Sequence, residues 1–466
     1  MDDGLSDKEF IQLALDRFQQ CVEAESKNRE EALDDWKFKL GEQWPENYKK
    51  DRQADGRPCL TMNRLPAQVK QVTNEQRAQR PAAQVNPVGS DADVDTAEVI
   101  QGMLRHIEIN SDAEIAYDNA FECMVTGGFG YYRIITDYAD EEGLEQEIMV
   151  EWIENPFTVY LDPAAKKPDK SDAKFGFIFK DMTRLEYEAE YKDSQLASLE
   201  EMTSQGDVPA EWLSKDGVRV AEYFYVETEK KKLDNGREVT KRKVKWALIN
   251  AVEILEKQDW LGKYIPIVPV LGDSANIDGK RYLSGIVRNA KDPQRQINFM
   301  ESAATEAVAL APRAPYTAAA GQTENYPEWK TANTRNHAVL RYDAMDVQGK
   351  PVPPPQRNNV EPPIQAIMLM LRQANDDLKA VTGLYDPSLG NAHQDQSGKA
   401  IQNLQKQGDV GNLNWSDNLS RSMRYGYRMI LDLIPKIYDT DRIQRIVNPD
   451  GSAKMVNITN SAGANG

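Results

Sequence analysis

One stretch near the C-terminal end of the chain constrains the fold most. After Ser397, apolar or small residues recur every three or four positions, at Ile401, Leu404, Gly408, Gly411, Trp415, Leu419, Met423, Tyr427, Ile430, Ile434 and Ile437. This is the period of one helix face, and Ser397 stands where an N-cap belongs. The stretch predicts one helix of about forty residues and about 60 Å, far longer than most helices of globular domains.

The first half of this predicted helix has an unusual composition. It carries polar and glycine residues where a packed helix would carry Leu or Ala, namely Gln402, Gln405, Gln407, Gly408, Gly411, Asn412 and Asn414. Each interior glycine costs about 1 kcal/mol relative to Ala, and Pro435 should kink or end the helix. We interpret the stretch as a long strut with a weak, uncharged segment. The alternative is two helices joined by a loop over residues 408–414.

Composition bounds the class of protein. The chain has 466 residues, enough for two or three domains, and its three cysteines (Cys21, Cys59 and Cys123) are typical of reduced, buried thiols in a cytosolic protein. The acidic start predicts no signal peptide, and no apolar run approaches the length of a membrane span. A net charge of −17 argues against tight, nonspecific binding of nucleic acid, although the acidity could simply keep the protein soluble.

The first third of the chain reads as helical, followed by a hairpin. The first expected element is a helix over 5–44, whose apolar stripe continues through Leu33, Trp36 and Leu40. A short helix after Pro66 and a strand over 83–87 are expected next. They are followed by a helix capped by Asp95, a helix over 113–125 and a β-hairpin after Gly127. Asp91, Asp93 and Asp95 have the opening spacing of a calcium loop, but Thr96 stands where its glycine belongs. Gly128 and Gly130 precede a strand, so they indicate a tight turn and not a phosphate loop.

Residues 175–270 read as mainly β, with a helix near 185–197 and a buried strand in the YIPIVPV segment. Asn235-Gly236 between two long strands predicts a type I′ hairpin turn. Around its tip lies the one dense basic patch of the chain, made of Lys230, Lys231, Lys232, Arg237, Lys241, Arg242, Lys243 and Lys245. The patch is either a solvated hairpin protected from edge aggregation or a docking surface for an acidic partner or DNA.

Asp292-Pro293 predicts the start of a helix that ends before Pro312. Its small residues would let a neighbouring helix approach closely, within one chain or between copies. Short strands are expected over 314–320 and 338–342, a stiff proline-rich linker over 351–363, a helix over 364–382 closed by Gly383, and disorder after Asn448.

The sequence contains no recognisable catalytic motif. There is no P-loop, no G-x-S-x-G and no H-E-x-x-H. The three histidines, His106, His337 and His393, are far apart in the sequence and have no cysteine partners. We therefore expect no enzyme activity, no metal and no cofactor. The many carboxylates leave a two-metal nuclease open on composition alone.

The order of several short motifs resembles a known family. They are Arg57-Pro58-Cys59-Leu60-Thr61-Met62-Asn63, Asn74 to Arg77 with Pro81, Gly127-Gly128-x-Gly130, Asn155-Pro156 with Asp162-Pro163, the run from Gly272 to Asn298, and Thr382-Gly383-Leu384-Tyr385 with Ser397-Gly398-x-Ala400-Ile401. Together they are similar to the portal (head-to-tail connector) proteins of tailed bacteriophages, of the podovirus type.

The resemblance implies an α+β portal-like fold assembled as a ring of about twelve copies at one capsid vertex. Viral DNA would be packaged and ejected through its channel without sequence-specific contact. The implied partners are the terminase packaging motor, a tail adaptor or head-completion protein, and capsid and scaffold proteins, with assembly in the host cytoplasm and no membrane. The alternative function is a metal-dependent nuclease of the packaging machinery. Podovirus-type members often add a helical barrel after the crown, so a chain ending at Gly466 would be a short member or part of a longer one.

The family's parts map onto the chain as an N-terminal part of the wing (1–165), a β-rich region with the clip (166–271), the stem helix region (272–311), a wing and channel-proximal segment (312–395), the long wing or crown helix (396–447) and a disordered tail (448–466). On this mapping the docking candidates are Lys230, Lys231, Lys232, Arg237, Lys241, Arg242 and Lys243. The candidates for packing between stem helices of neighbouring copies are Ile297, Met300, Ala303, Ala304 and Ala307. The channel-proximal candidates are Gln405, Gln407, Gly408 and Gly411.

Overall fold

The computed structural model describes residues 6–82, 84–87, 94–138, 145–192, 194, 212, 217–232, 238–310, 316–332, 337–345, 347–357, 364–384, 398–438, 442–447 and 451–458. The chain forms two compact units. The first contains Met1–Trp36, Val69–Arg288 and Pro387–Gly466, and the second contains Lys37–Gln68 and Asn289–Asp386. No helix in the described part of the chain is long and apolar enough to cross a membrane.

Two antiparallel sheets form the centre of the first unit. One has the strand order β3-β4-β5-β6-β7 and the other β2-β1-β8. The bounds are β1 (Phe129–Tyr138), β2 (Gln146–Trp152), β3 (Val159–Leu161), β4 (Phe175–Thr183), β5 (Gly217–Lys232), β6 (Glu238–Ile249), β7 (Ile254–Asp259) and β8 (Ile267–Leu271). The long β5–β6 pair and the β1–β2 hairpin confirm the strands predicted on either side of Asn235-Gly236 and after Gly127.

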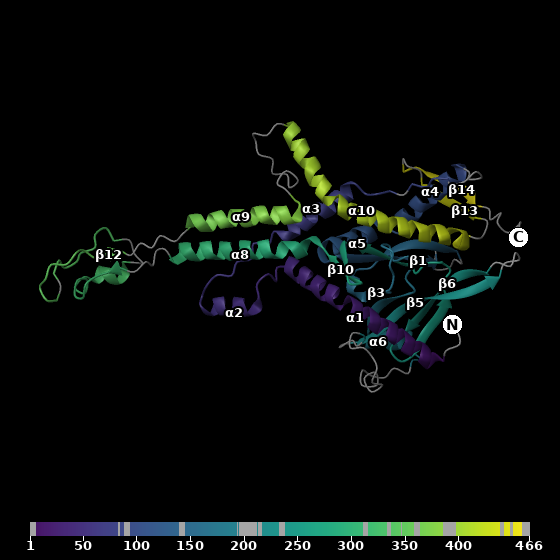
Figure 1. Cartoon of the computed structure of the whole chain (residues 1–466), viewed down its shortest axis with the longest axis horizontal. Helices are drawn as coiled ribbons and strands as arrows, with labels where there is room; N and C mark the ends of the chain where they lie inside the picture. The colour runs from purple at the N-terminus through teal and green to yellow at the C-terminus, as the bar shows by residue number, and fades with distance from the viewer. Residues whose placement is uncertain are drawn as a thin grey trace. The chain divides into compact units, whose positions relative to one another are not determined.

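Helices cover the outer face of each sheet, so the first unit has four layers (Figure 1). Helix α1 (Asp7–Lys39) packs on the five-stranded sheet, and α5 (Ala113–Gly127) and α10 (Gly398–Ile437) pack on the three-stranded one. Successive side chains of a strand point to opposite faces of the sheet, so the five-stranded sheet has a separate apolar core on each face. Tyr223 and Tyr225 of β5 face α1, whereas Phe224 lies between the sheets.

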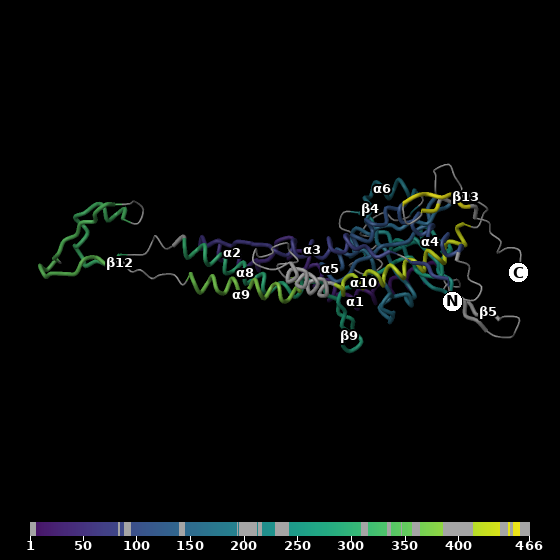
Figure 2. Tube along the Cα trace, turned by 90° about the horizontal axis from the view of Figure 1, so that it is seen from above, coloured from purple at the N-terminus to yellow at the C-terminus, as the bar shows by residue number. Residues whose placement is uncertain are grey.

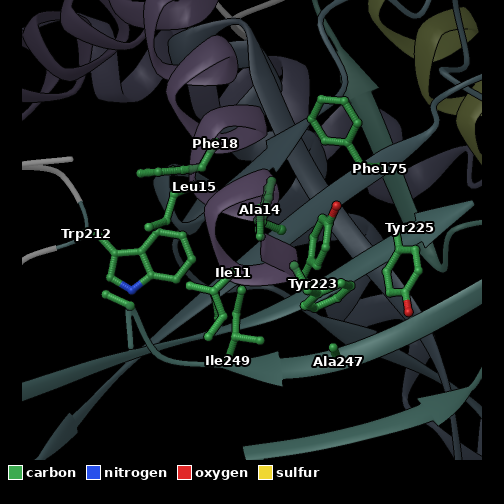
Figure 3. Packing of buried hydrophobic residues seen from close by; sticks show 14 of the residues in the cluster. Ile11, Ala14, Leu15, Phe18, Phe175, Trp212, Tyr223, Tyr225, Ala247 and Ile249 are labelled. Atoms are coloured by element: carbon green, nitrogen blue, oxygen red, sulfur yellow. The ribbon is translucent and has the colours of Figure 1, made fainter. Parts of the chain in front are cut away.

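The contact of α1 with the sheet is largely aromatic (Figure 3). Phe18 meets Trp212 edge to face with the ring centroids 5.2 Å apart, and Phe10 packs against Tyr223. Further along α1 the predicted stripe is wrong, because Leu33 is exposed and Asp35 is buried in its place. The reason is the ion pair between Asp35 and Arg288, which lie 2.8 Å apart.

The glycine turn after α5 is confirmed and has a steric cause. Gly128 adopts a φ of 95° and closes α5. A Cβ on Gly130 would lie 2.0 Å from the carbonyl oxygen of Ala120, so β1 can cross α5 at this distance only with glycine.

Helix α10 is one helix of 40 residues, which confirms the strut and rules out the two-helix alternative. Trp415, Leu419, Met423 and Ile430 are buried as the stripe predicts. Pro435 lies inside the helix close to its end at Ile437. The side chains of residues 398–412 lie outside the part that the structure describes.

The remaining elements of the first unit are shorter. They are α3 (Leu65–Ala78), which continues into it from the second unit, α4 (Val94–Asn110), η2 (Pro156–Thr158), α6 (Arg184–Glu190), the β9 (Asp273–Ile277) and β10 (Lys280–Ser284) hairpin, and the β13 (Arg442–Val447) and β14 (Ala453–Ile458) hairpin.

β14 corrects the prediction of disorder directly after Asn448. The expected strand at 83–87 is also wrong over 84–87, because the N–H of Val85 donates to the side chain of Gln101 and not to a strand.

The second unit is mostly helical, with α2 (Glu46–Ala54), α8 (Ile286–Leu310, which begins in the first unit) and α9 (Ile364–Thr382). Between α8 and α9 lie β11 (Tyr316–Thr317), η5 (Pro327–Thr331) and β12 (Gln356–Arg357). α9 has the predicted bounds, and Gly383 after it has a φ of 72°. No strand forms over 338–342, which corrects that prediction.

The predicted start of α8 is wrong, since the helix begins seven residues before Pro293. Proline inside a helix removes one backbone hydrogen bond. Val287 and Ala290 in the preceding turns are fully buried. Their burial stabilises the extra turns and outweighs the local proline signal.

Candidate functional site: the α8 ladder and the surfaces around it

Every fourth residue of α8 from Gln294 to Glu306 is polar, and we call Gln294, Asn298, Ser302 and Glu306 the α8 ladder. Residues four apart lie on one helix face, so the ladder is a polar stripe. Its first three members are buried, and Asn298 is only 1% exposed. Buried polar side chains need hydrogen-bond partners. An extended segment of the same unit, residues 57–64, supplies them.

The ladder binds the backbone of this segment as a neighbouring strand would. The N–H of Leu60 donates to Ser302 Oγ at 2.9 Å, and the N–H of Met62 donates to Asn298 Oδ1 at 2.8 Å. Gln294 Nε2 donates to the carbonyl oxygen of Met62 at 2.8 Å, and its Oε1 accepts from the N–H of Arg64 at 3.2 Å. The segment therefore has its backbone register fixed by helix side chains, without a sheet.

A second row of amides supports the ladder. Asn298 Nδ2 donates to Gln43 Oε1 at 2.6 Å, and Gln43 Nε2 donates to Asn63 Oδ1 at 2.8 Å. Asn63 in turn donates to the carbonyl oxygen of Lys39 at 2.7 Å. A connected buried network of this kind favours one arrangement strongly, because each buried polar group left without a hydrogen-bond partner would destabilise the fold.

The ladder ends in an ion-pair cluster. Glu306 accepts from Arg57 Nε at 2.8 Å and from Arg52 Nη2 at 3.0 Å. The hydrogen bond from Arg57, together with the charges of Arg57 and Arg52, lowers the pKa of Glu306. Arg52 also donates to the carbonyl oxygen of Pro58 at 3.1 Å, which holds the start of the segment. The arrangement positions a chain segment through hydrogen bonds and ion pairs.

The predicted stem-packing residues divide in two. Ile297 is 0% exposed, so its own chain covers it and no surface remains for a second copy. That assignment is wrong for Ile297, because its side chain is fully covered within the single chain. Met300, Ala303, Ala304 and Ala307 are half-buried and lie on the helix side opposite the ladder. Their role between copies stays a prediction.

Helix α9 lies alongside α8 (Figures 1 and 2) and exposes apolar residues that the sequence reading did not single out. Leu371, Ala374 and Leu378 are buried. Three consecutive residues before them, Met368, Leu369 and Met370, are exposed, and Leu369 is 70% exposed. Contiguous exposed apolar side chains of this kind often mark a surface that binds another molecule.

The described residues between β11 and β12 form a module organised by a polar side chain. Gln322 is buried, accepts from the N–H of Ala319 at 2.9 Å and donates to the carbonyl oxygen of Pro353 at 2.7 Å. Among the described residues of 316–357, no apolar side chain is buried, whereas Met345 and Val347 are exposed. The module therefore has no apolar core in the part that the structure describes.

Two residues of the predicted docking patch have partners within the chain. Arg242 donates to the carbonyl oxygen of Ser171 at 3.0 Å and also bonds that of Ala173. Lys243 pairs with Asp259 at 2.6 Å. Both are therefore engaged within the chain, where Arg242 holds the loop at residues 171–173. Their role in docking stays a prediction. The side chains of Lys230, Lys231, Lys232, Arg237 and Lys241 lie outside the described residues.

The channel-proximal candidates lie within two turns of the first half of α10. Gln405, Gln407, Gly408 and Gly411 all belong to this helix, but their side chains are outside the described part. The second half is fixed by Ser422, whose Oγ donates to the carbonyl oxygen of Pro269 on β8 at 2.7 Å. The prediction that the first half borders a channel stays a prediction.

The described residues offer no metal centre. No group of three or more His, Cys, Asp or Glu side chains among them is placed to hold an ion. Cys21, Cys59 and Cys123 are free thiols, of which Cys59 is only half-buried and not buried as predicted.

Comparison with known proteins assigns this mixed α/β chain to a class. The chain belongs to the phage P22-like portal protein family, whose model matches residues 15–466. A relative named portal protein, from Acyrthosiphon pisum secondary endosymbiont phage 1, is 26% identical over 444 residues, covering 85% of this chain and 60% of the relative. The chain thus spans about 60% of that relative's length. The family confirms the resemblance drawn from the sequence and gives no support to the nuclease alternative.

Proposed function

We propose that copies of this chain form a ring at one vertex of a phage capsid, and that viral DNA is packaged and later ejected through its channel. Membership of the portal family supports this role. The net charge of −17 also suits it, because an acidic protein can enclose DNA without gripping the phosphates. The protein acts as a conduit and docking platform and catalyses no reaction of its own.

The observation that carries the proposal is the exposed apolar surface of the second unit. Met368, Leu369 and Met370 are exposed to solvent in the single chain. Burying a side chain such as Leu369 yields about 1.5–3 kcal/mol. In a closed ring each copy would cover this surface on its neighbour. The module around Gln322, which lacks an apolar core among its described residues, would gain neighbours in the same way.

The particle mass tests the proposal directly. One chain weighs 52.6 kDa, so a ring of about twelve copies would weigh about 630 kDa. Light scattering on the full chain should report a particle of this order. Leu369→Asp places a charge in the proposed contact and should shift the mass toward the single chain. Gln365→Asp on the same helix, also exposed, is the matched control and should leave the ring intact.

Two results would overturn the proposal. A single chain at all accessible concentrations would exclude a stable ring. A ring that forms equally well with Leu369→Asp would exclude the α9 surface as the contact. Circular dichroism of both variants distinguishes loss of assembly from loss of folding.

The ring would also dock partners. Following the family, we propose that the hairpin tip around Lys230, Lys232 and Lys241 contacts the packaging motor and later the tail adaptor, and that capsid and scaffold proteins surround the ring. The dense positive charge in an acidic protein supports this contact, since complementary charge speeds and orients association.

A further inference from the structure

A groove on the first unit has no part in the function proposed above. It has a volume of about 500 Å³ and runs between α10 and residues 81–82 and 84–86. Its floor consists of buried apolar or aromatic side chains, Leu104 from α4 and Met423 and Tyr427 from α10. The opposite wall is held in place by the N–H of Val85, which donates to Gln101 Oε1 at 2.6 Å.

The rim of this groove is positive. Arg424 and Arg428 lie one turn apart on α10 and line it, whereas no acidic residue lines it among the described residues. Arg424 Nε donates to the carbonyl oxygen of Ser420 in its own helix at 3.3 Å, and within the described part of the chain it has no carboxylate partner. Arg428 is 61% exposed and reaches Asp169 only at 3.6 Å.

This pairing of an apolar floor with two guanidinium groups selects a ligand chemistry. A guanidinium binds a carboxylate through two parallel hydrogen bonds, and residues four apart on a helix lie about 6 Å from each other. The groove therefore fits two carboxylates about 6 Å apart beside one apolar side chain. In a chain of net charge −17, such a local positive site is complementary to acidic partners.

We propose that this groove, defined by Leu104, Met423, Tyr427, Arg424 and Arg428, binds an acidic peptide segment of a partner protein through one apolar anchor. The anchor occupies the floor between α4 and α10, and the flanking carboxylates bind the two arginines. Duplex DNA fits less well, because its sugar–phosphate backbone would leave the apolar floor uncovered. The proposal goes beyond the channel function and does not require the ring.

Selection from a random nine-residue peptide display library on the full-length protein tests it. Enriched peptides should share an apolar residue flanked by Asp or Glu. Fluorescence anisotropy with the best peptide should show a loss of about tenfold in affinity for each arginine reversed in Arg424→Glu/Arg428→Glu. Arg421→Glu is the matched control. It changes the same helix outside the groove, where Arg421 pairs with Asp417 at 3.3 Å, and should alter affinity less than about twofold.

Three outcomes would overturn the proposal: no enrichment, enriched peptides without carboxylates, or equal binding to the reversed variant. The same anisotropy measurement with a labelled DNA duplex tests whether the groove binds nucleic acid instead. If the duplex binds and loses affinity in the reversed variant while the peptides do not bind, the surface is a nucleic-acid site. Should the double reversal fail to fold, Arg424→Gln/Arg428→Gln removes the charges without adding new ones and must still weaken the peptide complex.

Discussion

Asn298 of α8 accepts a hydrogen bond from the backbone N–H of Met62 at 2.8 Å, although the two residues are 236 positions apart in the chain. The same side chain donates to Gln43 Oε1 at 2.6 Å. One buried amide thus connects α8, the extended segment and the residues that follow α1. Asn298 is therefore the member of the ladder that links all three segments.

Asn298→Ala should destabilise the second unit by about 2–4 kcal/mol, because it leaves two buried groups without partners. Hydrogen exchange at the Met62 amide should rise more than at amides of the first unit. Thr305→Ala, at an exposed position of the same helix, should change stability by no more than about 0.5 kcal/mol. Unchanged exchange at Met62 in Asn298→Ala would show that the ladder does not hold the segment.

Gly426→Ala should destabilise the first unit by about 1–3 kcal/mol. The new Cβ would lie 2.6 Å from the hydroxyl of Tyr132, which is buried and donates to the carbonyl oxygen of Ser422 at 3.2 Å. In an open helix position the same change would stabilise by about 1 kcal/mol. The measurement is the urea unfolding midpoint.

A double-mutant cycle checks the cause of that loss. Tyr132→Phe removes the hydroxyl that the new Cβ meets. Gly426→Ala/Tyr132→Phe should therefore lose less stability than the sum of the single changes. Simple additivity would mean that another contact, and not the Tyr132 hydroxyl, excludes a side chain at this position.

Glu108 predicts a pH dependence. Its burial raises the pKa of the carboxyl, against the hydrogen bonds from Tyr427 and Tyr117 and the charge of Arg105, which lower it. A raised folded-state pKa means that its contribution to stability is complete below the unfolded pKa and is lost as the pH rises through the folded pKa.

Glu108→Gln retains an acceptor for both tyrosines, which donate to Oε1 at 2.6 and 3.0 Å, and carries no charge. The variant should gain stability relative to the natural protein as the pH rises from about 4 to about 8, measured by urea unfolding. If the stability of Glu108→Gln relative to the natural protein instead increased toward low pH, the raised pKa of Glu108 would be contradicted.

Reversing charge at the hairpin tests the docking proposal. Lys230→Glu, Lys232→Glu and Lys241→Glu together should weaken binding of the packaging motor protein by about tenfold, without changing the mass of the ring. Arg242 is left in place because it holds the carbonyl of Ser171. Equal reversal of the exposed Lys8, Lys49 and Lys50 should leave the affinity unchanged. If both triple variants bind alike, the hairpin is not the docking surface.

The regular elements could be predicted because their signals are local. The stripe from Trp415 to Ile430 has the period of a helix, and α10 follows it without a break. Gly383 and the glycine turn at Gly128 were predictable from the left-handed conformations that favour glycine. The family itself was recognisable from the order of short motifs.

The candidate site was much less predictable. The ladder's four polar residues are visible in the sequence at a spacing of four, but polar residues at that spacing usually mark an exposed helix face. Arg242 was assigned to docking because neighbouring basic residues share its segment, whereas its partners, Ser171 and Ala173, lie about seventy positions earlier.

The sequence by itself determined the helices α9 and α10, the strands of the two long hairpins and the glycine turn at Gly128, since these depend on neighbours a few residues apart. It also identified the family. Only the tertiary structure decided that Gln294, Asn298 and Ser302 are buried, that Pro293 lies inside α8, and that Leu369 faces outward. Each of these depends on whether a distant segment supplies a partner or leaves a side chain uncovered. Such pairings are set by packing and hydrogen bonding across hundreds of residues, which local periodicity does not record.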